Sequence, residues 1–283
     1  MLGSLVRFAS SDIHVSLKAE PIAQIGPLTV TNSMLYGLLS SIFIITLLVW
    51  AAKKIKIEPK KGLSQFVEMI MDFIITMLEG VFGNRERAIK FAPIFGSFFI
   101  FIIVNNTLGL LPVVGPSVEV SYQGVATPLL RPFTADLNAT IAMAVSAILL
   151  VQVLSIKEQG GKKHLQHYFT NKPWNPINFF IGILEVFGEL TRILSLSLRL
   201  FLNTAVGEIL IAVFTSLVLS KGRTPLAALP IILFEVLVAG IQAYVFTVLS
   251  ATYLGLAISH ADDHGTESDH DKIDASKQVE GAH

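Results

Sequence analysis

Residues 177–219 read INFFIGILEVFGELTRILSLSLRLFLNTAVGEILIAVFTSLVL and are apolar apart from a few charged side chains. The stretch is longer than the roughly 20 residues that a helix needs to cross the hydrocarbon core of a bilayer. The whole chain has the same character, because 52% of its 283 residues are hydrophobic and only 15% are charged. Soluble domains carry about 25% charged residues. The sequence therefore predicts an integral membrane protein.

Four further apolar segments accompany this one, at residues 33–52, 91–111, 137–156 and 229–259. Together they predict an all-α membrane protein with about five transmembrane helices, the last two long helices forming an antiparallel hairpin. Residues 63–82 differ, because their polar side chains recur every three or four residues and form one stripe: Gln65, Glu68, Asp72, Thr76 and Glu79. We expect this amphipathic helix to lie in the membrane plane.

The distribution of lysine and arginine predicts which side of the membrane each segment faces. Most basic residues follow the first and third spans, which places these two connections and the C-terminus on the inner side. Residues 1–30 are then an outer leader, retained because Arg7 interrupts the apolar stretch of a signal peptide. The membrane domain covers residues 31–258. The polar tail at 259–283 is predicted to be disordered, and a solvated tail is favoured over a metal site for its histidines: His260, His264 and His270.

Several classes of function are excluded or disfavoured by composition. The net charge is zero, which gives no reason to expect nucleic acid as a partner. There is no cysteine, so disulfide scaffolds, zinc thiolates and cysteine catalysis are excluded. No phosphate-binding loop, catalytic nucleophile or zinc motif occurs. We therefore expect neither a cofactor nor catalysis by this chain alone.

Arg199 is the most informative charge in the 177–219 segment, with six uncharged residues before it and eight after it. An arginine at mid-bilayer costs at least about 2.5 kcal/mol, so it usually has a partner or a function. Arg192 can pair with Glu189, but roughly 15 Å of helix separates Glu189 from Arg199. We expect Arg199 to find no carboxylate on its own helix; pairing elsewhere within the chain is the alternative.

Two carboxylates lie nearer the predicted outer surface than Arg199. Glu208 follows nine residues later, roughly 180° around the helix. In the last span Glu235 and Gln242 are seven residues apart, share a face and are separated by roughly 10 Å along the axis. Because the last two spans are antiparallel, Glu208 and Glu235 can line one outward-facing aqueous pocket and exchange protons there. For each of them, a helix–helix hydrogen bond without transport is the alternative.

Four motifs resemble subunit a of F-type ATP synthases. They are SLSLRLFLNTAVGE at 195–208, GIQAYVFTVLSATYLG at 240–255, PFTADLNAT at 132–140 and NNTLGLLP at 105–112. The resemblance covers roughly residues 30–258 in the same order and includes the membrane-plane helix. The arginine and glutamine motifs together are highly specific for this family.

The resemblance implies seven residues for proton translocation: Arg199, Glu208, Glu235, Gln242, Asn203, Glu185 and Glu189. Arg199 matches the essential arginine that faces the carboxylate of the rotor ring, and Gln242 matches a glutamine near it. Asn203 matches the family asparagine one turn after the arginine. Leu202 departs from the family, which usually has glycine there, and so needs a matching gap in the rotor or in a neighbouring helix.

The same resemblance implies a proton path in two offset halves. Glu208 and Glu235 belong to the outer half-channel, while Glu185 and Glu189 lie near the inner one. Arg199 separates the halves, because an arginine stays charged even when buried and its charge opposes a direct proton leak.

The implied partners are the rotor c-ring, the peripheral stalk subunit b, other ATP synthase subunits and the lipid bilayer. The chain would be a multi-pass protein of the CF(0), or Fo, sector in an energy-transducing membrane, such as a bacterial inner membrane. It would carry out ion transport for ATP synthesis without catalysing ATP chemistry.

Two other readings of the residues stay open at this point. In a secondary transporter Arg199 would bind an anionic substrate, although such proteins usually contain paired inverted repeats. A structural membrane scaffold is the other reading. It would need neither an unpaired arginine nor outward carboxylates in adjoining spans.

Overall fold

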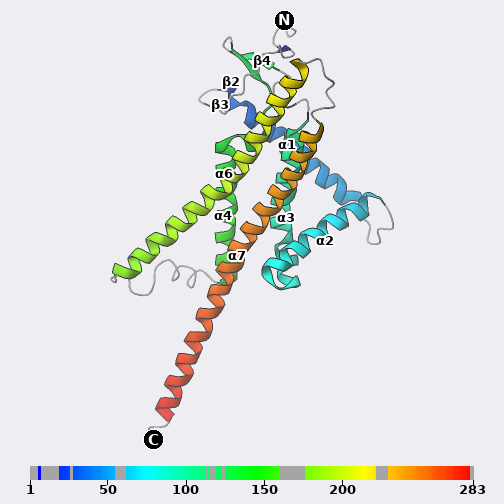
Figure 1. Ribbon diagram of the computed structural model, residues 1–283. Helices are drawn as coiled ribbons and strands as arrows, with labels where there is room; N and C mark the ends of the chain where they lie inside the picture. The colour runs from blue at the N-terminus through cyan, green and yellow to red at the C-terminus, as the bar shows by residue number, and fades with distance from the viewer. Residues whose placement is uncertain are drawn as a thin grey trace.

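The computed structural model describes residues 6–7, 19–25, 28–54, 62–111, 114, 119–122, 125–159, 176–220 and 229–280. Its helices are α1 (Asn32–Lys54), α2 (Leu63–Phe82), α3 (Arg85–Gly109), α4 (Leu137–Gln159), α6 (Pro176–Ser220) and α7 (Leu229–Glu280) (Figure 1). Within these residues, every helix except α2 is long and apolar enough to cross a membrane, which makes five candidate spans. The predicted all-α membrane architecture is thus confirmed.

Short strands occupy the connections at the end of the molecule opposite the C-terminus (Figure 1). β1 (Val6–Arg7), β4 (Glu119–Tyr122) and β5 (Val125–Pro128) form one antiparallel sheet, in which β4 is central. β2 (Pro21–Ile25) and β3 (Leu28–Thr31) form a separate hairpin directly before α1. From the sequence, these segments were expected to be an outer leader and a connecting loop, and no strands were predicted in them. Each is too short to give a clear alternation of polar and apolar residues.

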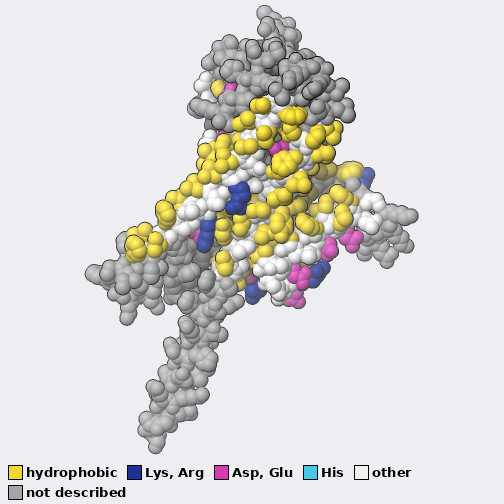
Figure 2. All heavy atoms as spheres, in the orientation of Figure 1, with side chains coloured by type: hydrophobic (Ala, Val, Ile, Leu, Met, Phe, Trp, Pro, Cys, Tyr) yellow, Lys and Arg dark blue, Asp and Glu magenta, His cyan; other side chains and the backbone are white. Residues whose placement is uncertain are grey.

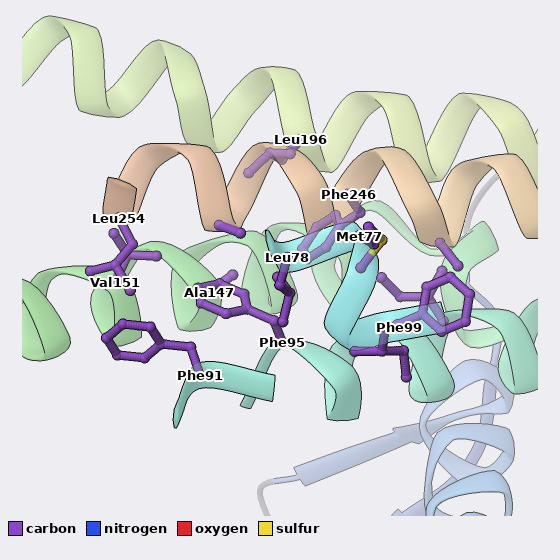
Figure 3. Packing of buried hydrophobic residues seen from close by; sticks show 14 of the residues in the cluster. Met77, Leu78, Phe91, Phe95, Phe99, Ala147, Val151, Leu196, Phe246 and Leu254 are labelled. Atoms are coloured by element: carbon purple, nitrogen blue, oxygen red, sulfur yellow. The ribbon is translucent and has the colours of Figure 1, made fainter. Parts of the chain in front are cut away.

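The apolar core lies where α2, α3, α4 and α7 meet (Figure 3). Phe95 of α3 and Phe246 of α7 are fully buried in it. The ring centres of Phe98 and Phe246 lie 5.9 Å apart. Gly96 of α3 allows Ile74 of α2 to approach closely, since a Cβ added to Gly96 would lie 3.3 Å from the Ile74 side chain. Helix–helix packing of this kind depends on close van der Waals contact, because lipid is as apolar as the helices themselves.

Helix α2 runs obliquely beside the spanning helices (Figure 1), and its position in the membrane plane stays a prediction. It ends at Gly83, whose φ of 64° lies in the left-handed region that favours glycine. Asn84 then caps α3 by accepting a hydrogen bond from the Glu86 amide at 2.8 Å. Arg85 contacts Glu79 at 3.1 Å and Asp72 at 3.4 Å, so acidic and basic side chains meet at the edge of α2 (Figure 2).

Helix α6 is held mainly near its middle. Leu196, Ser197 and Leu200 are buried, and Ser197 donates a hydrogen bond to Thr140 of α4. Toward its beginning, by contrast, the apolar side chains of α6 are exposed, with Phe187 at 65%. α6 and α7 lie close where α6 ends and α7 begins, and they diverge toward the other end (Figure 1). The inner half of α6 therefore projects from the core.

Helix α7 continues through the polar tail to Glu280, where the sequence analysis expected disorder from residue 259. Once a helix has started, each added residue contributes a hydrogen bond without a new nucleation cost. After Pro230, α7 contains no further proline that would interrupt it. The tail histidines, for which a solvated state was preferred over a metal site, have side chains outside the described residues.

Candidate functional site

A small polar cavity lies between α3, α6, α7 and the segment before α4. Its lining residues are Asn106, Gly109, Leu110, Pro132, Asn203, Thr204, Gly207, Glu208, Ile211, Glu235, Val238 and Ala239. The cavity volume that water can occupy is about 40 Å³, which is large enough to hold ordered water. The cavity brings Glu208, Glu235 and Asn203 together at the end of the molecule that the charge pattern assigns to the outside.

Glu208 does not stand alone in this cavity, because a buried arginine accompanies it. The Nη2 atom of Arg131 lies 3.6 Å from the Oε2 atom of Glu208. Arg131 is only 4% exposed, whereas the Glu208 side chain keeps 25% of its surface accessible. Arg131 belongs to no span and was not predicted from the sequence as a site residue. The available signal was a single cation in the otherwise uncharged stretch 125–135.

Glu235 enters the cavity against a glycine of the facing helix. Glu235 is 8% exposed, and a Cβ built on Gly207 would lie 2.7 Å from its Cδ atom. A separation below 3.0 Å requires something to shift, so any larger side chain at 207 displaces the carboxylate. Glycine at this position therefore lets the two helices bring Glu208 and Glu235 to the same cavity.

A chain of side-chain hydrogen bonds supports the wall of the cavity. Thr134 donates to Asn106 of α3 at 2.7 Å, and Thr204 of α6 donates to Thr134 at 3.1 Å. Asp136 accepts from Ser33 of α1 at 2.7 Å and from the Asn138 amide at 3.0 Å. These contacts hold the segment that carries Arg131 against α1, α3 and α6.

Arg199 lies on another face of α6. Among the residues that the structure describes, no carboxylate pairs with it and no hydrogen bond to its guanidinium is present. Its neighbours Leu198 and Leu202 are 42% and 53% exposed, whereas Arg199 itself is half-buried. Gln242 is buried in α7, and its Nε2 atom has no hydrogen-bond partner among the described residues.

The predicted inner residues are only partly described. Glu189 accepts a hydrogen bond from Arg192 at 2.6 Å, so the ion pair expected from their spacing forms. The Arg192 guanidinium also lies 4.8 Å from the ring centre of Tyr253, which links α6 to α7. The side chain of Glu185 lies outside the described residues.

These features define a multi-pass helical membrane protein with a carboxylate-lined cavity and, in one long span, a separate arginine that is unpaired within the described part of the chain. The family model "ATP synthase A chain" matches residues 34–255, and the chain belongs to this family.

Individual relatives agree with this assignment. Subunit a of Moorella thermoacetica ATP synthase is 29% identical over 82% of this chain and 93% of its own length. Subunit a of Citrifermentans bemidjiense is 32% identical over 81% of this chain and 89% of its own. ATP synthase subunit a 2 of Chlorobaculum tepidum is 33% identical over 73% of this chain, but the match spans only 56% of that relative.

Proposed function

We propose that this chain is the proton-channel stator subunit of an F-type ATP synthase, which couples proton flow to rotation of the rotor ring. Family membership supports this role. The observation that carries it is Arg199, half-buried on α6 between exposed leucines and without an acidic partner among the described residues. A cation in this setting is costly unless a carboxylate is supplied to it. A ring of helices with one carboxylate each supplies that partner repeatedly as it turns.

Proton entry is assigned to the cavity. A proton from the outside reaches Glu208 and Glu235, passes to a rotor carboxylate and neutralises it, so that the rotor site can face lipid. Asn203 lines the same cavity and contributes a polar side chain on the α6 wall. Movement of one charge across 100 mV releases about 2.3 kcal/mol, so several protons are needed for each ATP.

Proton release is assigned to the inner half of α6. After nearly a full turn, a rotor site meets the path near Glu185 and Glu189 and gives up its proton. Arg199 lies between entry and release and favours the ionised carboxylate that arrives beside it. Gln242, on the adjoining span, completes the set of polar residues near this crossing point.

The proposed partners are the rotor c-ring and the peripheral stalk subunit b, with the other subunits catalysing ATP synthesis. A bacterial inner membrane is the proposed location. Neither alternative from the sequence analysis is favoured. A transporter would have to bind its anion at Arg199 on an exposed face of a helix, and a scaffold has no use for a cation there.

Disulfide cross-linking tests the face assigned to the rotor. The chain has no cysteine, so single cysteines can be introduced without background. We expect Leu202→Cys to form a disulfide with a cysteine placed beside the rotor carboxylate, because Leu202 is exposed next to Arg199. Val153→Cys is the control, since Val153 is 49% exposed but belongs to α4. Cross-linking from Val153 and none from Leu202 would place the rotor elsewhere.

Gly207→Ala is expected to slow ATP-driven proton pumping by about tenfold, because the new methyl group displaces the Glu235 carboxylate from the cavity. Pumping is measured in inverted membrane vesicles that contain the complete complex. Gly188→Ala is the matched control on the same helix, since nothing lies within 4 Å of an added Cβ there. Equal rates for both variants would contradict the role of the glycine.

A further inference from the structure

Arg131 is a buried cation that the proton path described above does not use. It is 4% exposed and lies 3.6 Å from Glu208, in a segment between β5 and α4 rather than in a span. The next residue, Pro132, lines the same cavity as Glu208. Arg131 therefore reaches the entry site from outside the two helices that carry its carboxylates.

The segment around Arg131 is fixed on both sides. Before it, the carbonyl of Pro128 accepts a hydrogen bond from Asn32 of α1 at 3.3 Å. After it, Thr134 bonds to Asn106 and to Thr204, which lies one turn before Glu208. The position of the guanidinium relative to α6 is thus set by several independent contacts. A chance approach of a flexible side chain would not be anchored in this way.

The charges of the cavity are distributed unevenly. Two carboxylates share it, and repulsion between like charges in a poorly hydrated site opposes ionisation of both. Arg131 offsets this repulsion at Glu208. No ion pair to Glu235 occurs among the residues that the structure describes. The arginine thereby distinguishes two carboxylates that the sequence presents as equivalent.

We infer that Arg131 is a positioning residue for proton entry, which orients Glu208 toward the cavity and favours its ionised form, so that Glu208 accepts protons from the outer side. The inference rests on the proposed function of the cavity. The separation of 3.6 Å is too long for a hydrogen bond. Glu208 can therefore take up a proton without first breaking one to Arg131.

The test compares Arg131→Gln and Arg131→Lys, each in the natural background and with Glu208→Gln. Proton pumping and ATP synthesis are measured in vesicles with the complete complex, normalised to the amount assembled. We expect Arg131→Gln to lower both rates by about tenfold, since one partner of a buried charge pair is lost. Arg131→Lys should recover most of the loss because it keeps the charge. With Glu208→Gln present, either change at 131 should add less than about twofold.

Arg85→Gln is the control for removing an arginine from an ion pair, because Arg85 is exposed and such pairs contribute little to stability.

Equal fold losses from Arg131→Gln with and without Glu208→Gln would overturn the inference, because the arginine would then act through packing. Normal rates for an assembled Arg131→Gln would overturn it as well. If Arg131→Gln does not assemble, Arg131→Lys alone decides: near-normal rates support the inference, and a loss of about tenfold in the assembled complex overturns it, because the positive charge is kept. A failure of the proposed function itself is distinguishable, since Glu208→Gln alone would then leave pumping unchanged.

Discussion

Replacing Arg199 with alanine is expected to abolish ATP-coupled proton pumping while the complex still assembles. The guanidinium has no carboxylate or hydrogen-bond partner among the described residues, so its removal leaves no buried acid without its counterion. Proton release from the rotor carboxylate should be lost instead, because the carboxylate no longer meets a fixed positive charge that favours its ionised form. The barrier between the two half-channels is lost at the same time.

The measurement follows proton uptake into inverted vesicles during ATP hydrolysis, together with the amount of complex in the membrane. Arg85→Gln serves as the control, since it removes an arginine whose side chain is 54% exposed and should leave pumping unchanged. Pumping at normal rates in Arg199→Ala would exclude the barrier role. Loss of assembly would mean that Arg199 has a structural partner after all.

Glu208→Gln is expected to slow proton entry by about tenfold or more, because the amide keeps the size of the side chain but cannot carry a proton. It also leaves Arg131 buried without the acid that it contacts. Proton flux is measured in vesicles with the complete complex, in both directions. Glu208→Asp should retain part of the proton flux, because aspartate keeps a carboxylic acid but its shorter side chain does not extend as far into the cavity.

Glu68→Gln is the matched control for this experiment, because Glu68 is an exposed acid on α2 and lies outside the cavity. Its flux should equal that of the unmodified complex. An unchanged flux in Glu208→Gln would move the entry path to another part of the chain.

Hydropathy alone predicted the spans, because each contains an apolar run long enough to cross a bilayer. Helix periodicity similarly predicted the Glu189–Arg192 pair, since the two residues are three apart on one helix. Both kinds of information are local in sequence. The same reasoning placed Glu208 and Glu235 nearer the outer surface than Arg199, and the structure gives them a common cavity.

What the sequence could not predict depends on contacts between distant segments. Arg131 is 77 positions from Glu208 (208 − 131), and no periodicity relates a connecting segment to a span. The close approach of Gly207 to Glu235 likewise depends on how α6 and α7 cross. In the three-stranded outer sheet, β1 pairs with β4, which is distant from it in the chain. Such pairings are decided by tertiary packing rather than by local preference.

The projecting inner half of α6 has a mechanical consequence. Under the proposed function, a turning ring would push sideways on this helix, which is anchored near its middle through Ser197 and Thr204. Arg199 lies between these two anchoring residues, whereas the apolar side chains around Phe187 lie exposed outside the bundle. A sideways load on the inner half would therefore move Arg199 less than the exposed part of the helix, and its distance from each passing rotor site would change little.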